Sequence, residues 1–240
     1  MTPLLLALIG LAVGLALDAL VVRLAVRPDH GDDEPDEPEA PEPVPTFPAF
    51  HTETGSLVVA SPLQTWTRRL VIVATTAALF AVAGGQYDKA SHLAIITAYI
   101  CVFVACAATD ALSYRVPNVI TYPAIVGAMF VGAVMPDADV KEVLGGGLLA
   151  GGVLLLPALF TGGVGMGMGD VKLAAFVGLA LGFTNLVPAL LFMSLLGGGA
   201  AALLLITGLR KRGEPIPYAP FIAAGALATL LWQGAAFVNL

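Results

Sequence analysis

Long apolar runs separated by short polar turns dominate the chain. The first run covers residues 3–26, and a polar interval separates it from the others. The seven later runs cover residues 70–85, 92–109, 119–135, 143–161, 171–184, 186–207 and 219–238. A helix of about 20 apolar residues is long enough to cross the hydrocarbon core of a bilayer. The pattern therefore predicts an all-α polytopic membrane protein with about eight transmembrane helices.

The composition supports this class and explains the acidic net charge. Hydrophobic residues make up 58% of the 240 residues and charged residues only 12%, which is too apolar for a water-soluble domain. The formal charge is −6, but residues 28–54 contain nine acidic and no basic residues. Removing these nine from the 17 acidic residues leaves eight, against 11 basic residues. The acidity is therefore local, and no nucleic-acid partner is expected.

A proline-rich acidic segment divides the chain. Residues 28–50 interleave seven prolines with aspartate and glutamate, and such a segment cannot bury enough apolar area to offset the entropy lost on ordering. We expect three parts. They are a first transmembrane helix at 1–26, an acidic Pro/Glu-rich cytosolic linker at 27–67, and a seven-helix membrane domain at 68–240.

Basic residues indicate which ends of the helices face the cytoplasm. If the N-terminus lies outside, nine of the 11 basic residues fall in cytoplasmic intervals. These intervals are 23–69, 110–118, 162–172 and 208–218. Only Lys89 and Lys141 fall on the other side. Cytoplasmic loops are enriched in Lys and Arg, so the distribution supports both the orientation and the count of eight.

Two aspartates lie at the ends of different helices on this cytoplasmic face. Asp170 follows the glycine-rich turn 165–169 and begins an apolar segment, whereas Asp110 ends the third span. An ionisable residue within a membrane is costly and indicates a functional site. When two carboxylates lie close together, one is held protonated and the other ionised. Such a dyad can activate a water molecule and protonate a departing amine.

The glycines and the aspartates also have structural interpretations. The three glycines of the turn, at 165, 167 and 169, are expected to allow positive φ and a close approach of other chain segments to Asp170. Asp110 could instead pair with Arg115, and Asp170 could be a helix N-cap. Elsewhere, Pro157 and Pro188 are expected to kink or delimit their helices.

A third carboxylate, Asp18, lies inside the first apolar run near its Arg23 end. One interpretation is that it snorkels to the interface or bonds to a neighbouring helix. The other is a supporting role at the site, because ionisable residues within spans are costly. We favour the first interpretation.

Four segments in order along the chain resemble the bacterial type IV prepilin peptidase family. Residues Gly167–Asp170 match the GxGD signature of membrane aspartyl proteases, and the longer run GMGDVKLAAFVGLALG is similar to that family. Asp110 followed by Val116–Thr121 resembles the first catalytic aspartate and its downstream Pro-Asp/Asn motif. Ile216–Phe221 resembles the segment before the last span. Gly14–Leu24 resembles the first span, with aspartate in place of the usual asparagine.

The resemblance implies an aspartic endopeptidase of the inner (cytoplasmic) membrane. Such an enzyme removes a short basic leader from type IV prepilins or pseudopilins at the cytoplasmic face and leaves an apolar helix as the new N-terminus. Asp110 and Asp170 would be the catalytic pair. The site-shaping residues would be Gly167, Gly169, Lys172, Pro117 and Asn118. Lys172 would either tune the dyad or extend to the lipid headgroups, and we favour the headgroups. The implied partners are the prepilin and the lipid bilayer.

The chain departs from the family at one point. Bifunctional members carry paired CxxC motifs after the first span, which bind zinc and are linked to N-methylation of the new amino terminus. The corresponding interval here, 27–67, contains no cysteine. We therefore expect a peptidase with no metal site and no cofactor, in which N-methyltransferase activity is doubtful. The oligomeric state is not readable from the sequence.

Other functions are compatible with two carboxylates in apolar helices. A small proton-coupled transporter is one, although its carboxylates would lie near the bilayer midplane and not at helix ends. A non-catalytic assembly component of a pilus or secretion machine is another. A GxGD protease that cuts within the membrane, as the presenilin type does, is a third.

Overall fold

The computed structural model describes residues 3–26, 62–160, 166–209 and 216–239, which are mainly helical. The helices are α1 (Pro3–Val26), α2 (Pro62–Gln86), α3 (Ala90–Ser113), α4 (Asn118–Val134), α5 (Val140–Phe160), α6 (Met168–Ile206) and α7 (Ala219–Trp232). Two short antiparallel strands, β1 (Gly234–Ala235) and β2 (Val238–Asn239), follow α7. The all-α prediction is confirmed.

Five of these helices are long and apolar enough to cross a bilayer, namely α1, α2, α3, α5 and α6. The apolar helices α4 and α7 are shorter. Large hydrophobic side chains are exposed on the outer faces of the helices, for example Leu148, Phe160 and Leu195. A helix with apolar residues all around it is typical of a bilayer environment. The chain is therefore a multi-pass membrane protein.

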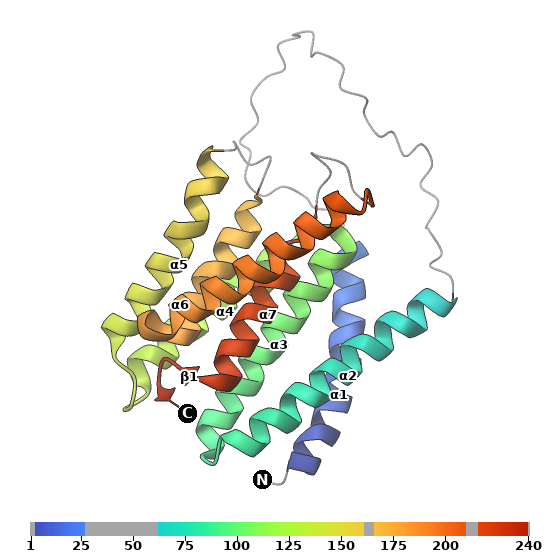
Figure 1. Cartoon of the computed structure of the whole chain (residues 1–240). Coiled ribbons are helices and arrows are strands. Elements are labelled where there is room, and N and C mark those ends of the chain that lie inside the picture. Colours follow the sequence, from blue (N-terminus) through green and yellow to red (C-terminus); the bar gives the residue numbers. More distant parts are fainter. Residues whose placement is uncertain (1–2, 27–61, 161–165, 210–215, 240) are drawn as a thin grey trace, which may run out of the picture.

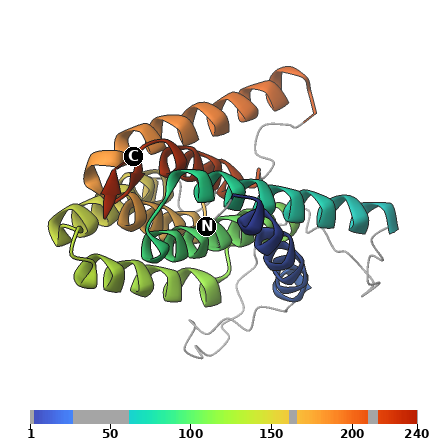
Figure 2. The same cartoon turned by 90° about the horizontal axis from the view of Figure 1, so that it is seen from below.

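The helices form one bundle around α3 and α7 (Figure 1). On one side of α3 lie α1 and α2, which pack along each other, and on the other side lie α4, α5 and α6. The view from below shows the same arrangement (Figure 2). The end of α3 and the start of α6 lie at the same end of the bundle, opposite the N- and C-terminal ends of the chain (Figure 1).

Helix α6 contains two of the eight expected spans, which explains why the described residues form seven helices. Its 39 residues turn back at Gly182, where φ is 76° and ψ is 170° (Figure 1). A continuous helix would pair the Thr184 N–H with the Ala180 carbonyl. Here the Thr184 N–H donates to Glu142 Oε2 at 2.9 Å, and Ala180 O accepts from the Ala236 N–H at 2.9 Å. External partners thus replace the lost helical bond.

Glycine contacts bring α5 against the first part of α6. A Cβ at Gly147 would lie 2.6 Å from Leu179 Cδ2, and one at Gly151 would lie 3.2 Å from Ala175 Cβ. Gly146 and Gly178 approach each other more closely still. These contacts hold the helix that carries Asp170 in place, because packing between transmembrane helices depends on close backbone approach.

Some boundaries differ from the expected ones. The acidic segment lies largely outside the described residues, and α2 already begins at Pro62. The expected last span, 219–238, is helical only to Trp232, because the chain turns at Gly234 (φ 101°) into the hairpin. Pro157 and Pro188 lie inside α5 and α6, and neither of them ends its helix.

Candidate active site

A cavity of about 980 Å³ opens at the end of the bundle where α3, α4 and α6 meet. The end of α1 also borders it through Leu24 and Ala25. All seven residues predicted for the site line this cavity, namely Asp110, Asp170, Gly167, Gly169, Lys172, Pro117 and Asn118. Residues from three separate segments of the sequence therefore come together here.

Asp110 lies in the last turn of α3 and is only 5% exposed. Its Oδ2 accepts a hydrogen bond of 3.0 Å from the backbone N–H of Ala219, the first residue of α7. The start of a helix carries partial positive charge, so α7 stabilises negative charge on Asp110. The Tyr114 N–H donates to the Asp110 carbonyl at 2.8 Å, and Tyr114 has a left-handed backbone with φ of 55°. That conformation is uncommon for a bulky residue, and here it ends α3.

Asp170 lies in the first turn of α6, after Gly167 at the N-cap position. Its Oδ1 is buried and has no hydrogen-bond partner among the described residues. A buried carboxylate oxygen without a partner is costly, and such groups are found where a substrate or a reacting water is bound. The open Oδ1 leaves Asp170 able to bind a substrate or a water molecule.

The two glycines of the GxGD signature have different surroundings. A Cβ at Gly169 would lie 2.9 Å from Val116 Cβ, so Gly169 lets the loop between α3 and α4 approach the start of α6. A Cβ at Gly167 would have no neighbour closer than 3.9 Å. Neither residue has positive φ, contrary to the expectation, and Gly165 lies outside the described residues. Close approach, not an unusual backbone, explains Gly169.

Lys172 connects α6 to the start of α4. Its Nζ donates to Asn118 Oδ1 at 3.0 Å and lies 4.6 Å from the centre of the Tyr122 ring. A cation over an aromatic face is attracted to it. The ammonium therefore has partners within the protein, whereas the sequence interpretation directed it to the headgroups. Pro117 directly precedes α4, as its N-cap residue, and its carbonyl accepts from the Thr121 N–H at 3.1 Å.

Tyr218, just before α7, extends the site. Burial raises the pKa of its phenol, and the negative charge of Asp170 raises this pKa further. The phenol therefore remains protonated at neutral pH. Its ring packs on Gly197, where a Cβ would lie 2.6 Å from Tyr218 Cε2. In the sequence, Tyr218 belongs to the motif Ile216–Phe221, and no role at the site was predicted for it.

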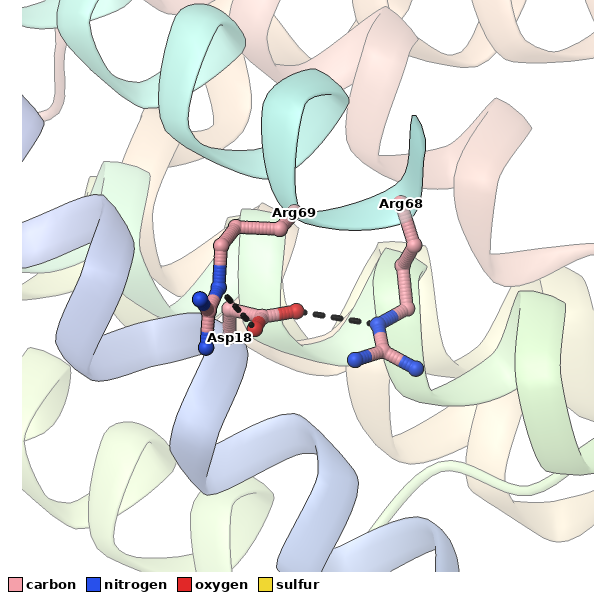
Figure 3. A network of polar contacts seen from close by, with 3 residues as sticks. All are labelled: Asp18, Arg68 and Arg69. Atoms are coloured by element: carbon pink, nitrogen blue, oxygen red, sulfur yellow. Dashed lines mark hydrogen bonds and ion pairs between the residues drawn. The ribbon is translucent and has the colours of Figure 1, made fainter. Parts of the chain in front are cut away.

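Asp18 lies in a separate network (Figure 3). It is 1% exposed, and its two oxygens accept hydrogen bonds from Arg68 Nε at 2.9 Å and Arg69 Nε at 3.2 Å. Both arginines belong to α2, so the network joins α1 to α2. The favoured interpretation, a bond to a neighbouring helix, agrees with this arrangement. Asp18 does not line the cavity.

Three contacts at the site were not anticipated from the sequence. They are the position of Val116 against Gly169, the Ala219 N–H on Asp110, and the Tyr122 ring under Lys172. For the contact of Val116 with Gly169, the one signal in the sequence is that Val116 directly precedes Pro117 and Asn118 in the motif Val116–Thr121. The others depend on the packing of α4, α6 and α7. In the part of the chain that the structure describes, no cluster of His, Cys, Asp and Glu side chains could hold a metal ion.

Comparisons with known proteins agree with the resemblance. The sequence pattern of the type IV leader peptidase family matches residues 97–203. A prepilin leader peptidase/N-methyltransferase of Bacillus subtilis is 33% identical over 162 residues, which cover 65% of this chain and 63% of that protein. The protein of the same name from Aeromonas salmonicida is 32% identical over 135 residues, covering 55% and 46% of the two chains.

A shorter match agrees with these. A prepilin leader peptidase/N-methyltransferase of Pseudomonas aeruginosa is 38% identical over 80 residues, covering 33% of this chain and 28% of that protein. The chain thus spans less than two thirds of the length of these relatives. No solved structure gives a significant match. The matched residues 97–203 include both Asp110 and Asp170 together with the parts of the cavity wall that α3, α4 and α6 supply. Residues 97–203, which carry both aspartates, are therefore similar to the type IV leader peptidase family.

Proposed function

We propose that the protein is an aspartic endopeptidase that removes the basic leader of a type IV prepilin or pseudopilin, using Asp110 and Asp170. The single observation that carries this proposal is the cavity in which both aspartates lie, one of them with a buried oxygen that has no described partner. A leader segment needs an open cleft at the end of the helices, and this cavity lies at the end of the bundle.

The chemistry follows from the two carboxylates acting together. One ionised carboxylate takes a proton from a water molecule, which attacks the carbonyl carbon of the scissile bond. The other, protonated, carboxyl donates a proton to the departing amine. The two groups share one proton and titrate as a pair. The N–H at the start of α7 holds the Asp110 carboxyl in place within the cavity.

The location of the reaction is part of the proposal. Positive residues concentrate in the intervals that join the cavity end of the helices, so we place this end at the cytoplasmic face of the inner membrane. We also propose that the product is released without N-methylation, because residues 27–67 contain no cysteine. Mass spectrometry of the processed prepilin tests this point, and a mass increase of one methyl group on the new amino terminus would contradict it.

The acidic segment suggests a smaller role in substrate capture. Its nine acidic residues between 28 and 54 would attract a basic leader at low salt. Replacing these residues with Asn and Gln should raise the apparent KM at low ionic strength and have little effect at high ionic strength. An unchanged KM at low salt would mean that the segment serves only as a linker and does not attract the leader.

The direct test is leader removal in a co-expression experiment. The full chain is produced with a prepilin of the same genome, and processing is followed by the shift in prepilin mass. Wild type should remove the leader, whereas Asp110→Asn and Asp170→Asn should leave it attached. Processing by either variant would contradict the dyad. An intact leader with wild type would contradict the peptidase assignment itself.

A further inference from the structure

A second hollow lies between α3 and α4 and opens at the surface of the bundle. It has a volume of about 490 Å³ and is lined by apolar side chains. Phe176 of α6 forms its floor, together with Tyr99, whose ring meets Phe176 edge-on at 5.4 Å between ring centres. We call this hollow the α3/α4 groove.

The α3/α4 groove adjoins the active-site cavity at the start of α4. Val119, in the first turn of α4, lines both. From there the groove follows α4 to Val131, about 18 Å further at 1.5 Å per residue. On α3 it covers Ala94 to Val102, so its near end lies about 12 Å along the helix from Asp110. A segment that leaves the cavity past Val119 and runs along α4 meets this groove.

The walls of the groove have the shape that a helix needs. Small residues line it, among them Ala94 and Ala98 on α3 and Ala124 and Gly127 on α4. A Cβ at Gly127 would have no neighbour within 4 Å, so the groove is open at this point. Helices in membranes associate where small residues allow close backbone approach. No charged side chain lines the groove among the described residues, which requires an apolar occupant.

We infer that the α3/α4 groove holds the apolar helix that follows the cleaved bond of the substrate. This inference rests on the proposed function and adds the surface that positions the substrate. With the scissile bond at the aspartates, the substrate helix lies alongside α4 and in the same direction. Gly127, about 12 Å beyond Val119, then contacts a substrate residue roughly eight positions further along the helix. A lipid chain or a second copy of this protein are the rival occupants.

The chain offers a matched pair of variants for testing the groove. Gly127→Leu fills it, and Gly152→Leu on α5 is the control, because a Cβ at Gly152 also has no neighbour within 4 Å and Gly152 lines neither the cavity nor the groove. Both replacements favour the helix, since leucine has a higher helix propensity than glycine. Purified full-length variants are assayed with full-length prepilin. Gly127→Leu should raise KM at least tenfold with little change in kcat, and Gly152→Leu should change neither.

A cross-linking experiment identifies the occupant directly. A photoreactive benzoylphenylalanine replaces Gly127 or Gly152 in the Asp110→Asn background, so that uncut prepilin accumulates. Cross-links from position 127 to the apolar helix of the prepilin, without such links from 152, support the inference. Links only to lipid or to a second copy overturn it, as does an unchanged KM for Gly127→Leu with active wild type. If wild type leaves the prepilin uncut, the proposed function itself fails.

Discussion

Asp18 and Asp170 are carboxylates on apolar helices with opposite surroundings. Asp18 is covered completely, and each of its oxygens accepts a hydrogen bond from an arginine of α2. Asp170 lies at a cavity, and its buried Oδ1 has no partner among the described residues. A buried charge is tolerated when it is paired and hydrogen-bonded, and it is costly otherwise.

The difference separates two uses of the same chemical group. The charge of Asp18 is balanced within the protein, so it joins α1 to α2 and has no capacity left for a substrate. The carboxylate of Asp170 retains that capacity, because its environment leaves an oxygen open and a second carboxylate, Asp110, lines the same cavity. Stability should depend on Asp18 and catalysis on Asp170.

The largest expected effect comes from the dyad. Asp110→Asn and Asp170→Asn should each lower kcat/KM for leader removal by a factor of about 1,000 or more, and the double variant should be no worse than either single one. Residues that act as one unit give such non-additive losses. Steady-state kinetics on the purified full chain measure this. If the loss of kcat/KM in the double variant equals the product of the two single losses, the two aspartates act independently.

The next effect concerns stability. Asp18→Ala should lower the free energy of unfolding by about 1–3 kcal/mol, because it leaves Arg68 and Arg69 without their shared carboxylate. Activity per folded molecule should remain close to that of wild type. Thermal unfolding in detergent measures the stability. Kinetics divided by the amount of folded protein measure the activity per molecule.

Asp170→Asn is the counterpart of this experiment. It removes a charge whose Oδ1 has no described partner, so the unfolding midpoint should stay the same or rise. A large loss of stability in Asp170→Asn, with none in Asp18→Ala, would contradict the structural role of Asp18 and the catalytic role of Asp170.

A smaller effect tests the turn that presents Asp170. Gly169→Ala should lower kcat by about 10- to 100-fold, since its Cβ would lie 2.9 Å from Val116 Cβ and force the start of α6 to move. Gly167→Ala should cost only a few-fold, because its nearest neighbour would be 3.9 Å away. Adding Val116→Gly should restore part of the activity of Gly169→Ala. Equal losses in both glycine variants would contradict this explanation.

The smallest effect is expected at Lys172. Lys172→Met keeps the apolar stem and removes the ammonium that bonds Asn118 and lies over Tyr122. We expect a loss of a few-fold in kcat/KM. Combining it with Asn118→Ala should add little, because both changes break the same contact. If the loss of kcat/KM in the combined variant equals the product of the two single losses, the two side chains act separately.

The sequence predicted the spans and the two aspartates at one face because apolar runs and basic residues are local signals. It also associated Asp110 with the residues around Pro117, which lie seven positions further and line the same cavity. The boundary expected between the spans 171–184 and 186–207 lies close to the turn within α6. Pro188 suggested a break, but the helix continues through it, and the reversal occurs at Gly182, where Glu142 and Ala236 supply the missing hydrogen bonds.

Contacts between distant segments were not readable. The partners of Asp18 lie 50 and 51 residues further along the chain, beyond the acidic segment, and nothing in the spacing relates them. The Ala219 N–H reaches Asp110 across 109 residues. Such contacts depend on which helices become neighbours, and shared apolarity does not specify this.

The most direct test compares Asp170→Asn with Asp18→Asn in one assay of leader removal per folded molecule, on the full-length protein and its prepilin. Both changes neutralise a single carboxylate and keep its size. We expect that Asp170→Asn leaves the leader intact and that Asp18→Asn removes it at nearly the wild-type rate. Leader removal by Asp170→Asn would contradict the account.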